Sequence, residues 1–128
     1  MKSIFLNIFI VMAIGLLTIT SCNNSKKSTA YDGTYVGTMP CADCSGIYTE
    51  ITLSGNEYSI KRIYQGKGDE AIFTDEGTYS WDPNSQILTL NGDPSEQYRI
   101  DEETLIALDM DGNPIDGEWA EMYILKKK

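Results

Sequence analysis

The sequence predicts an all-β domain of about eight short antiparallel strands, arranged as a sandwich or as a small up-and-down β-barrel. Three observations predict this class. After residue 31, apolar residues recur at every second position through most of the chain. Clusters of Gly, Asn, Asp, Ser and Pro separate the alternating segments at near-regular spacing, as expected for strands joined by tight turns. No stretch of this region sustains an apolar stripe at helical spacing.

Each strand follows from this pattern. The first is expected at 34–38, and the clearest is 46–53, where Ile47, Thr49, Ile51 and Leu53 share one face. A turn signal at 54–56 is followed by a strand expected at 57–64. The two strands and the turn between them are expected to form a β-hairpin. A Gly-rich loop precedes the strand at 71–81. After turn signals at 82–85 and 91–94, the remaining strands are expected at 86–90, 96–100, 104–108 and 120–125.

The first 21 residues predict a secretory signal peptide. Lys2 gives the positive start, and residues 4–17 form an apolar run that is too short to span a membrane comfortably. The stretch from Leu17 to Cys22 resembles the bacterial lipobox, in which small residues precede a cysteine that receives a diacylglycerol. We therefore expect a signal peptide at 1–21, a lipid on Cys22, a flexible tether over 22–30 and one β-domain over 31–128.

Composition narrows the compartment and the partners. Asn23, rather than Asp, follows the lipobox cysteine, and in enteric-type bacteria Asp there marks inner-membrane retention, so outer-membrane anchoring is expected. The net charge of -9 argues against a nucleic-acid partner and against electrostatic adhesion to anionic lipid. The chain has no histidine and no Ser or Lys in a recognisable nucleophile context, so we expect no enzymatic activity.

Cys41 and Cys44 are the one pair of residues with evident chemistry. In an oxidising compartment a close pair is by default a disulfide. Reduced, the two thiolates can converge on Cu(I), and Met39 is near enough in sequence to add a thioether, whereas Asp43 is a hard ligand. A redox or folding sensor and a local loop staple are also compatible with the spacing, although so short a closed loop gains little stability. Thioredoxin-like catalysis is disfavoured, because the motif precedes a strand and Asp43 disfavours a thiolate.

Residues 33–47, which read Gly-Thr-Tyr-Val-Gly-Thr-Met-Pro-Cys-Ala-Asp-Cys-Ser-Gly-Ile, resemble the opening of the N-terminal domain of the NlpE family of copper-resistance lipoproteins. The likeness continues through Leu53, 77–79 and 108–115. It implies a small barrel similar to bacterial lipocalins, anchored in the outer membrane. It also implies a role in copper tolerance and in signalling envelope stress to a sensor protein. Better-known members carry a second, OB-like domain that this sequence does not include, so functions needing that domain are not implied.

Two functional hypotheses follow. The first is a non-enzymatic lipoprotein of this type whose Cys41/Cys44 loop binds copper or senses redox state. The second is a lipocalin-like carrier of a small apolar ligand, lined by tyrosines with Trp81 and Trp119, in which the cysteine loop is merely structural. At strand spacing, however, aromatic residues more often pack in a core.

A calcium loop at 109–118 is disfavoured. In an EF-hand the sixth position is Gly and the twelfth is a bidentate Glu. Here these positions hold Pro114 and Ala120. We expect a polar connection between strands instead.

Overall fold

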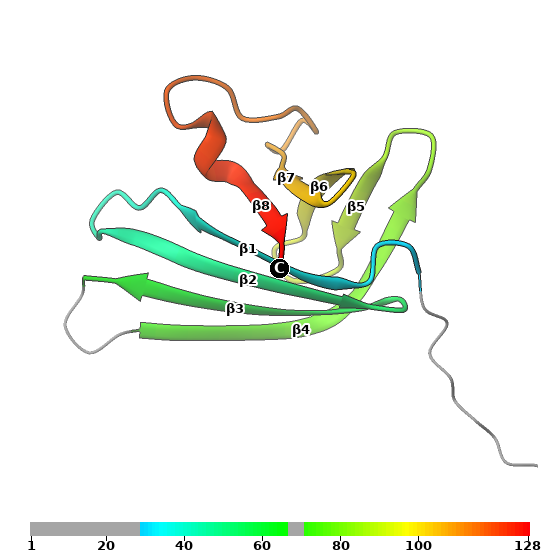
Figure 1. The fold of residues 1–128 in the computed structure, drawn as a ribbon, viewed down its shortest axis with the longest axis horizontal. Helices are drawn as coiled ribbons and strands as arrows, with labels where there is room; N and C mark the ends of the chain where they lie inside the picture. The colour runs from blue at the N-terminus through cyan, green and yellow to red at the C-terminus, as the bar shows by residue number, and fades with distance from the viewer. Residues whose placement is uncertain (1–28, 67–70) are drawn as a thin grey trace, which may run out of the picture.

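The structure is a computed structural model that describes residues 29–66 and 71–128. Its eight strands form one closed antiparallel barrel in which each strand pairs with its neighbours in sequence and the last pairs with the first. Figure 1 shows this arrangement. The strands are β1 (Gly33–Met39), β2 (Gly46–Ser54), β3 (Glu57–Gln65), β4 (Ala71–Asp82), β5 (Ile87–Leu90), β6 (Glu96–Asp101), β7 (Thr104–Ala107) and β8 (Ile124–Lys127). The predicted fold class is confirmed, and the choice between sandwich and barrel is resolved in favour of the barrel.

The core lies inside the barrel, because alternate residues of every strand point inward. In β2 the buried residues are Thr49, Ile51 and Leu53, on the face that the sequence predicts. The buried apolar side chains come from all eight strands: Tyr35, Ile51, Leu53, Tyr58, Ile60, Tyr79, Leu88, Leu90, Tyr98, Ile100, Leu105, Ala107 and Leu125. Four of them are tyrosines, which confirms the expectation that strand aromatics pack in the core. Trp119 and Phe73 are exceptions, with 56% and 49% of their surfaces exposed, and Tyr48 and Tyr64 are not part of the core.

Two predicted strands begin later than expected. The segment predicted as a strand at 120–125 starts as a 3-10 helix, η1 (Ala120–Tyr123), and only then becomes β8. Backbone bonds from Ala120 N to Gly117 O (3.2 Å) and from Met122 N to Trp119 O (2.9 Å) form this turn before the chain reaches the register of β7. The strand predicted from residue 86 starts at Ile87, because Gln86 has a φ of 59°, outside the strand region.

The strands differ in length, so the first half of β4 pairs with only one neighbouring strand. β2, β3 and β4 pair along most of their length, and in Figure 1 they extend well beyond β5, β6 and β7. β4 pairs with β5 only from Tyr79 to Asp82. The first half of β4 therefore pairs with β3 alone among the strands described.

The chain enters the barrel at one end and forms the cysteine loop at the other. At the entry, Asp32 Oδ1 accepts bonds from Thr29 Oγ1 (2.7 Å) and from the backbone N–H of Gly55 (3.0 Å). The ring of Tyr31 lies against Trp81 with 4.7 Å between centroids. From here β1 crosses the length of the barrel to Met39, after which the chain turns through the cysteines into β2.

Candidate functional site

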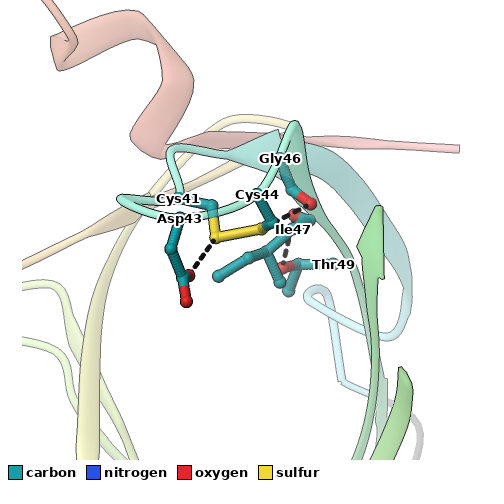
Figure 2. Close-up of a disulfide and its surroundings, with 6 residues drawn as sticks. All are labelled: Cys41, Asp43, Cys44, Gly46, Ile47 and Thr49. Carbon is teal, nitrogen blue, oxygen red and sulfur yellow. Dashed lines mark hydrogen bonds between the residues drawn. A yellow bond between two sulfur atoms is a disulfide. The ribbon is translucent and has the colours of Figure 1, made fainter. Parts of the chain in front are cut away.

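Cys41 and Cys44 form a disulfide in the loop between β1 and β2, with an S–S distance of 2.03 Å (Figure 2). Both cysteines are half-buried. The backbone N–H of Ser45 donates to the carbonyl of Gln65 on β3 at 2.9 Å and holds the end of the loop against the sheet. Gly46 is required where β2 begins, because a Cβ there would lie 2.7 Å from Thr38 Cγ2. The pairing expected from an oxidising compartment is thus the one the structure adopts.

Two polar groups lie next to the sulfurs, but they make no hydrogen bonds to the disulfide itself. Cys41 Sγ lies 3.5 Å from a carboxylate oxygen of Asp43, and Cys44 Sγ lies 3.5 Å from the carbonyl oxygen of Gly46. A disulfide sulfur carries no hydrogen, so these contacts become hydrogen bonds only when the cysteines are reduced. The reduced thiols therefore find acceptors in place, and the carboxylate disfavours the thiolate form of Cys41.

The disulfide lines a surface hollow with a volume of about 570 Å³. One wall is the loop itself, and the other comes from η1 and the residue before it, about 80 positions later in the chain. The lining residues are Pro40, Cys41, Ala42, Cys44, Ser45, Trp119, Met122 and Tyr123. The sequence pattern gave no sign that η1 belongs to this site, because the segment was predicted as a strand.

The cysteine loop holds a set of donor atoms that suits a soft metal only in the reduced form. Ligand atoms of Cys41, Asp43 and Cys44 all lie within 4.8 Å of one another. In the disulfide form the two sulfurs bond each other and offer no thiolate, so this set fits Cu(I) only after reduction. Met39 packs against the core and lines a different hollow, with Tyr98 and Ala107. The thioether on the cysteine hollow belongs instead to Met122.

A second polar cluster, which the sequence analysis did not find, lies inside the barrel. Arg62 Nη2 on β3 donates to both carboxylate oxygens of Glu96 on β6, at 2.8 and 2.6 Å. The hydroxyl of Tyr98 donates to the same carboxylate at 2.7 Å. Burial raises the pKa of Tyr98 well above its ordinary value, and the Glu96 carboxylate adds to the shift. The cluster links β3 to β6 across the barrel interior, and the negative charge of Glu96 balances the positive charge of Arg62.

The predicted signal peptide, the lipidation site Cys22 and most of the predicted tether lie outside the described residues. Within residues 29–66 and 71–128, no helix has the length and apolar character needed to cross a bilayer.

Comparison with known proteins decides the family. The sequence matches the NlpE N-terminal domain over residues 35–118, which is more than half of the chain. The chain belongs to the NlpE N-terminal domain family. A curated relative is Lipoprotein NlpE of Escherichia coli (strain K12), 27% identical over 119 residues that cover 83% of this chain and 50% of the relative. The chain thus spans about half the length of that NlpE protein.

Two solved structures share the fold of this NlpE-family chain. The crystal structure of a lipoprotein from Shewanella oneidensis is 44% identical, with a TM-score of 0.71, and the match covers 81% of this chain and 94% of that one. The crystal structure of the Cpx pathway activator NlpE from Escherichia coli is 29% identical, with a TM-score of 0.60, covering 67% of this chain and 46% of that one. The resemblance stated from the cysteine motif is confirmed.

Proposed function

We propose that this protein is a non-enzymatic lipoprotein of the bacterial outer membrane, anchored through Cys22. Its Cys41/Cys44 loop reports the thiol–disulfide state of the cell envelope to an envelope-stress sensor protein, and in the reduced state it binds copper(I). The observation that supports this most strongly is the position of the disulfide. It lies on a half-exposed loop outside the barrel core, where its state can change without disturbing the fold.

The size of the closed loop supports a reporting role over a structural one. Only two residues separate the cysteines, so the chain-entropy model gives a stabilisation of about 2 kcal/mol, near the low end for disulfides. The barrel is held by its strand pairing and its buried core, none of which includes these cysteines. Reduction is therefore expected to loosen the loop and leave the barrel folded.

The loop state is readable from outside because it shapes one wall of the hollow that Trp119 and Met122 complete. Trp119 is more than half exposed, and exposed aromatic residues beside a hollow are common in protein interfaces. Opening the disulfide moves Cys41 and Cys44 relative to this fixed wall. A partner docked here would meet a different surface in each state.

Copper binding depends on the same change. Two thiolates form a soft donor pair, and Met122 on the same hollow carries a thioether that suits Cu(I). Cu(I) bound by these sulfurs would hold the reduced state, because the ligands are no longer available for disulfide formation. Copper and redox state thus act on one equilibrium.

The redox arm is tested in the chain from residue 22 onward with Cys22→Ser, so that no lipid is present. Trp81→Phe leaves Trp119 as the single indole. We expect a midpoint potential above about -300 mV, the range of disulfides that are not purely structural. Trp119 fluorescence should rise on reduction, since a nearby disulfide quenches indole. The Cys41→Ser/Cys44→Ser variant should show no change. A midpoint far below -300 mV with unchanged fluorescence would assign the disulfide to a structural role.

The copper arm is tested by competition with a chromogenic Cu(I) chelator. The reduced chain should take Cu(I) from the chelator, whereas the oxidised chain and the Cys41→Ser/Cys44→Ser variant should not. Equal affinities of reduced and double-mutant chains would dismiss copper binding. In cells, membrane fractionation of the Cys22→Ala variant tests the anchor. An envelope-stress reporter compared between wild type and the double cysteine variant tests the signal.

The alternative function, a carrier of a small apolar ligand, is favoured only by a hollow of about 410 Å³ that Met39, Ala107 and Tyr123 help to line. The buried side chains of the core occupy the barrel interior where a carrier would hold its ligand. We expect a fluorescent fatty-acid probe to gain no signal on mixing with the protein. A saturable gain that a Met39→Trp substitution abolishes would revive the carrier hypothesis.

A further inference from the structure

Among the residues that the structure describes, the first half of β4 forms a sheet edge with one side unpaired. Residues 71–77 pair with β3 on one side, and no other described strand pairs with their second side. Figure 1 shows this half of β4 as the outermost strand of the extended β2–β3–β4 sheet. It contains neither Pro nor Lys, two of the residues with which proteins commonly block such edges. The edge is thus long and unblocked by these means.

The phase of the hydrogen bonds shows which backbone groups face the open side. Tyr79 N donates to Asn56 O at 2.9 Å, toward β3, whereas Thr78 O accepts from Asn91 N on the opposite side. Along an antiparallel strand the N–H and C=O of alternate residues point to alternate sides. Because the β3–β4 register continues without a bulge to Ala71, the groups of Ile72, Thr74 and Glu76 point outward.

The side chains along this edge combine apolar and acidic character. Ile72 and Phe73 are 59% and 49% exposed, although both are large apolar residues. A hollow of about 540 Å³ lies along Thr74, Asp75 and Glu76 and extends across β3 to Glu50 on β2. Glu50, Asp75, Glu76 and Lys61 line it. Asp75 accepts a hydrogen bond from the Tyr58 hydroxyl at 3.0 Å, and Glu50 lies 3.8 Å from Lys128 Nζ, so Glu76 is the carboxylate on β4 that the described contacts leave to an occupant of the edge. An occupant of this edge therefore meets backbone groups that no described strand pairs, an apolar start and the Glu76 carboxylate.

We propose that residues 71–77 bind an extended, basic segment of a partner protein as an additional β-strand. Main-chain bonds to Ile72, Thr74 and Glu76 supply the pairing, and basic side chains on alternate positions of the partner face Glu76 on β4. Charge selects this occupant over a second copy of the chain. A copy has a net charge of -9 and brings its own Asp75 and Glu76 to the same place. The residues that line the hollow along this edge are not those that line the cysteine hollow.

The test uses the Cys22→Ser chain from residue 22 and an eight-residue peptide that alternates lysine and valine. An identical peptide with glutamate in place of lysine is the charge control. Amide hydrogen exchange is followed by NMR. We expect the basic peptide to slow exchange at Ile72, Thr74 and Glu76 more than tenfold, while Phe73 and Asp75, already bonded to β3, change little. The acidic peptide should have no effect.

Two variants distinguish backbone pairing from loose electrostatic binding. Thr74→Pro removes an outward N–H that the β3 ladder does not use, so the barrel should keep its circular dichroism and lose the peptide. Thr74→Val keeps the N–H and should bind as wild type does. Glu76→Gln should weaken binding roughly twofold to fivefold, with a smaller effect at high salt. Unchanged binding in the folded Thr74→Pro variant, equal binding of the acidic peptide, or concentration-dependent protection without any peptide would each overturn the proposal.

Discussion

Replacing Glu96 by Leu should destabilise the barrel more than any surface substitution, because Glu96 is the acceptor for two groups inside it. The Arg62 side chain is only 16% exposed, and Tyr98 is 2% exposed. Removing one partner of a buried ion pair costs about 3–5 kcal/mol. The Glu96 side chain is 32% exposed, so water replaces part of the lost contact and the lower end of that range applies. The unpaired hydroxyl of Tyr98 adds about 1 kcal/mol.

The expected loss for Glu96→Leu is therefore about 3–4 kcal/mol in the free energy of unfolding, or a fall in Tm of roughly 15–20 °C for a domain of this size. Urea unfolding followed by circular dichroism measures it. The matched control is Arg62→Met/Glu96→Leu, which removes both charges and should return to within about 1 kcal/mol of the wild type. If the double variant were no more stable than Glu96→Leu alone, the stranded Arg62 charge would not be the cause of the loss.

Three further outcomes are expected. Because the pKa of Tyr98 is raised in the folded state, the contribution of Tyr98 to the free energy of unfolding should be constant below about pH 10 and should fall as the pH rises beyond it. In a pH series of urea titrations, Tyr98→Phe should therefore reduce the alkaline loss of stability. Gly37→Ala places a Cβ 2.7 Å from Leu125 Cδ2, which belongs to a fully buried side chain. The free energy of unfolding, measured by thermal denaturation, should therefore fall by about 1–3 kcal/mol. An unchanged value would mean that β8 can move away from the added methyl group. Cys41→Ser/Cys44→Ser should lower stability by about 2 kcal/mol with an unchanged far-ultraviolet spectrum, and global unfolding would contradict a disulfide outside the core.

The alternation of apolar residues was sufficient to predict most of the barrel. In β2 it placed Ile51 and Leu53 on the buried face, and turn signals located the hairpin into β3. The start of β8 could not be predicted in this way. Six residues, 120–125, show too few positions for their periodicity to distinguish a 3-10 turn from a strand. Gln86 likewise gave no local sign of its left-handed backbone, since a residue of that type usually avoids it.

Only the part of the candidate site that is close together in the sequence could be predicted. Cys41 and Cys44 are close in sequence, so their spacing alone suggested a disulfide or a metal pair. Their neighbours Trp119 and Met122 come from the other end of the chain, and only barrel closure brings them to the loop. The contact between Arg62 and Glu96 spans 34 positions and has no local signature in either strand.

The entry of the chain at Thr29 and the disulfide stand at opposite ends of β1, a strand of seven residues. At about 3.3 Å per residue, this separation amounts to roughly 20 Å. In the proposed lipid-anchored state, the chain reaches the lipid from the entry end, so the disulfide lies at the end of the barrel that is farther from the anchor. A receptor in the same bilayer would have to extend past the barrel to contact the disulfide, whereas a receptor in the facing membrane could contact it directly.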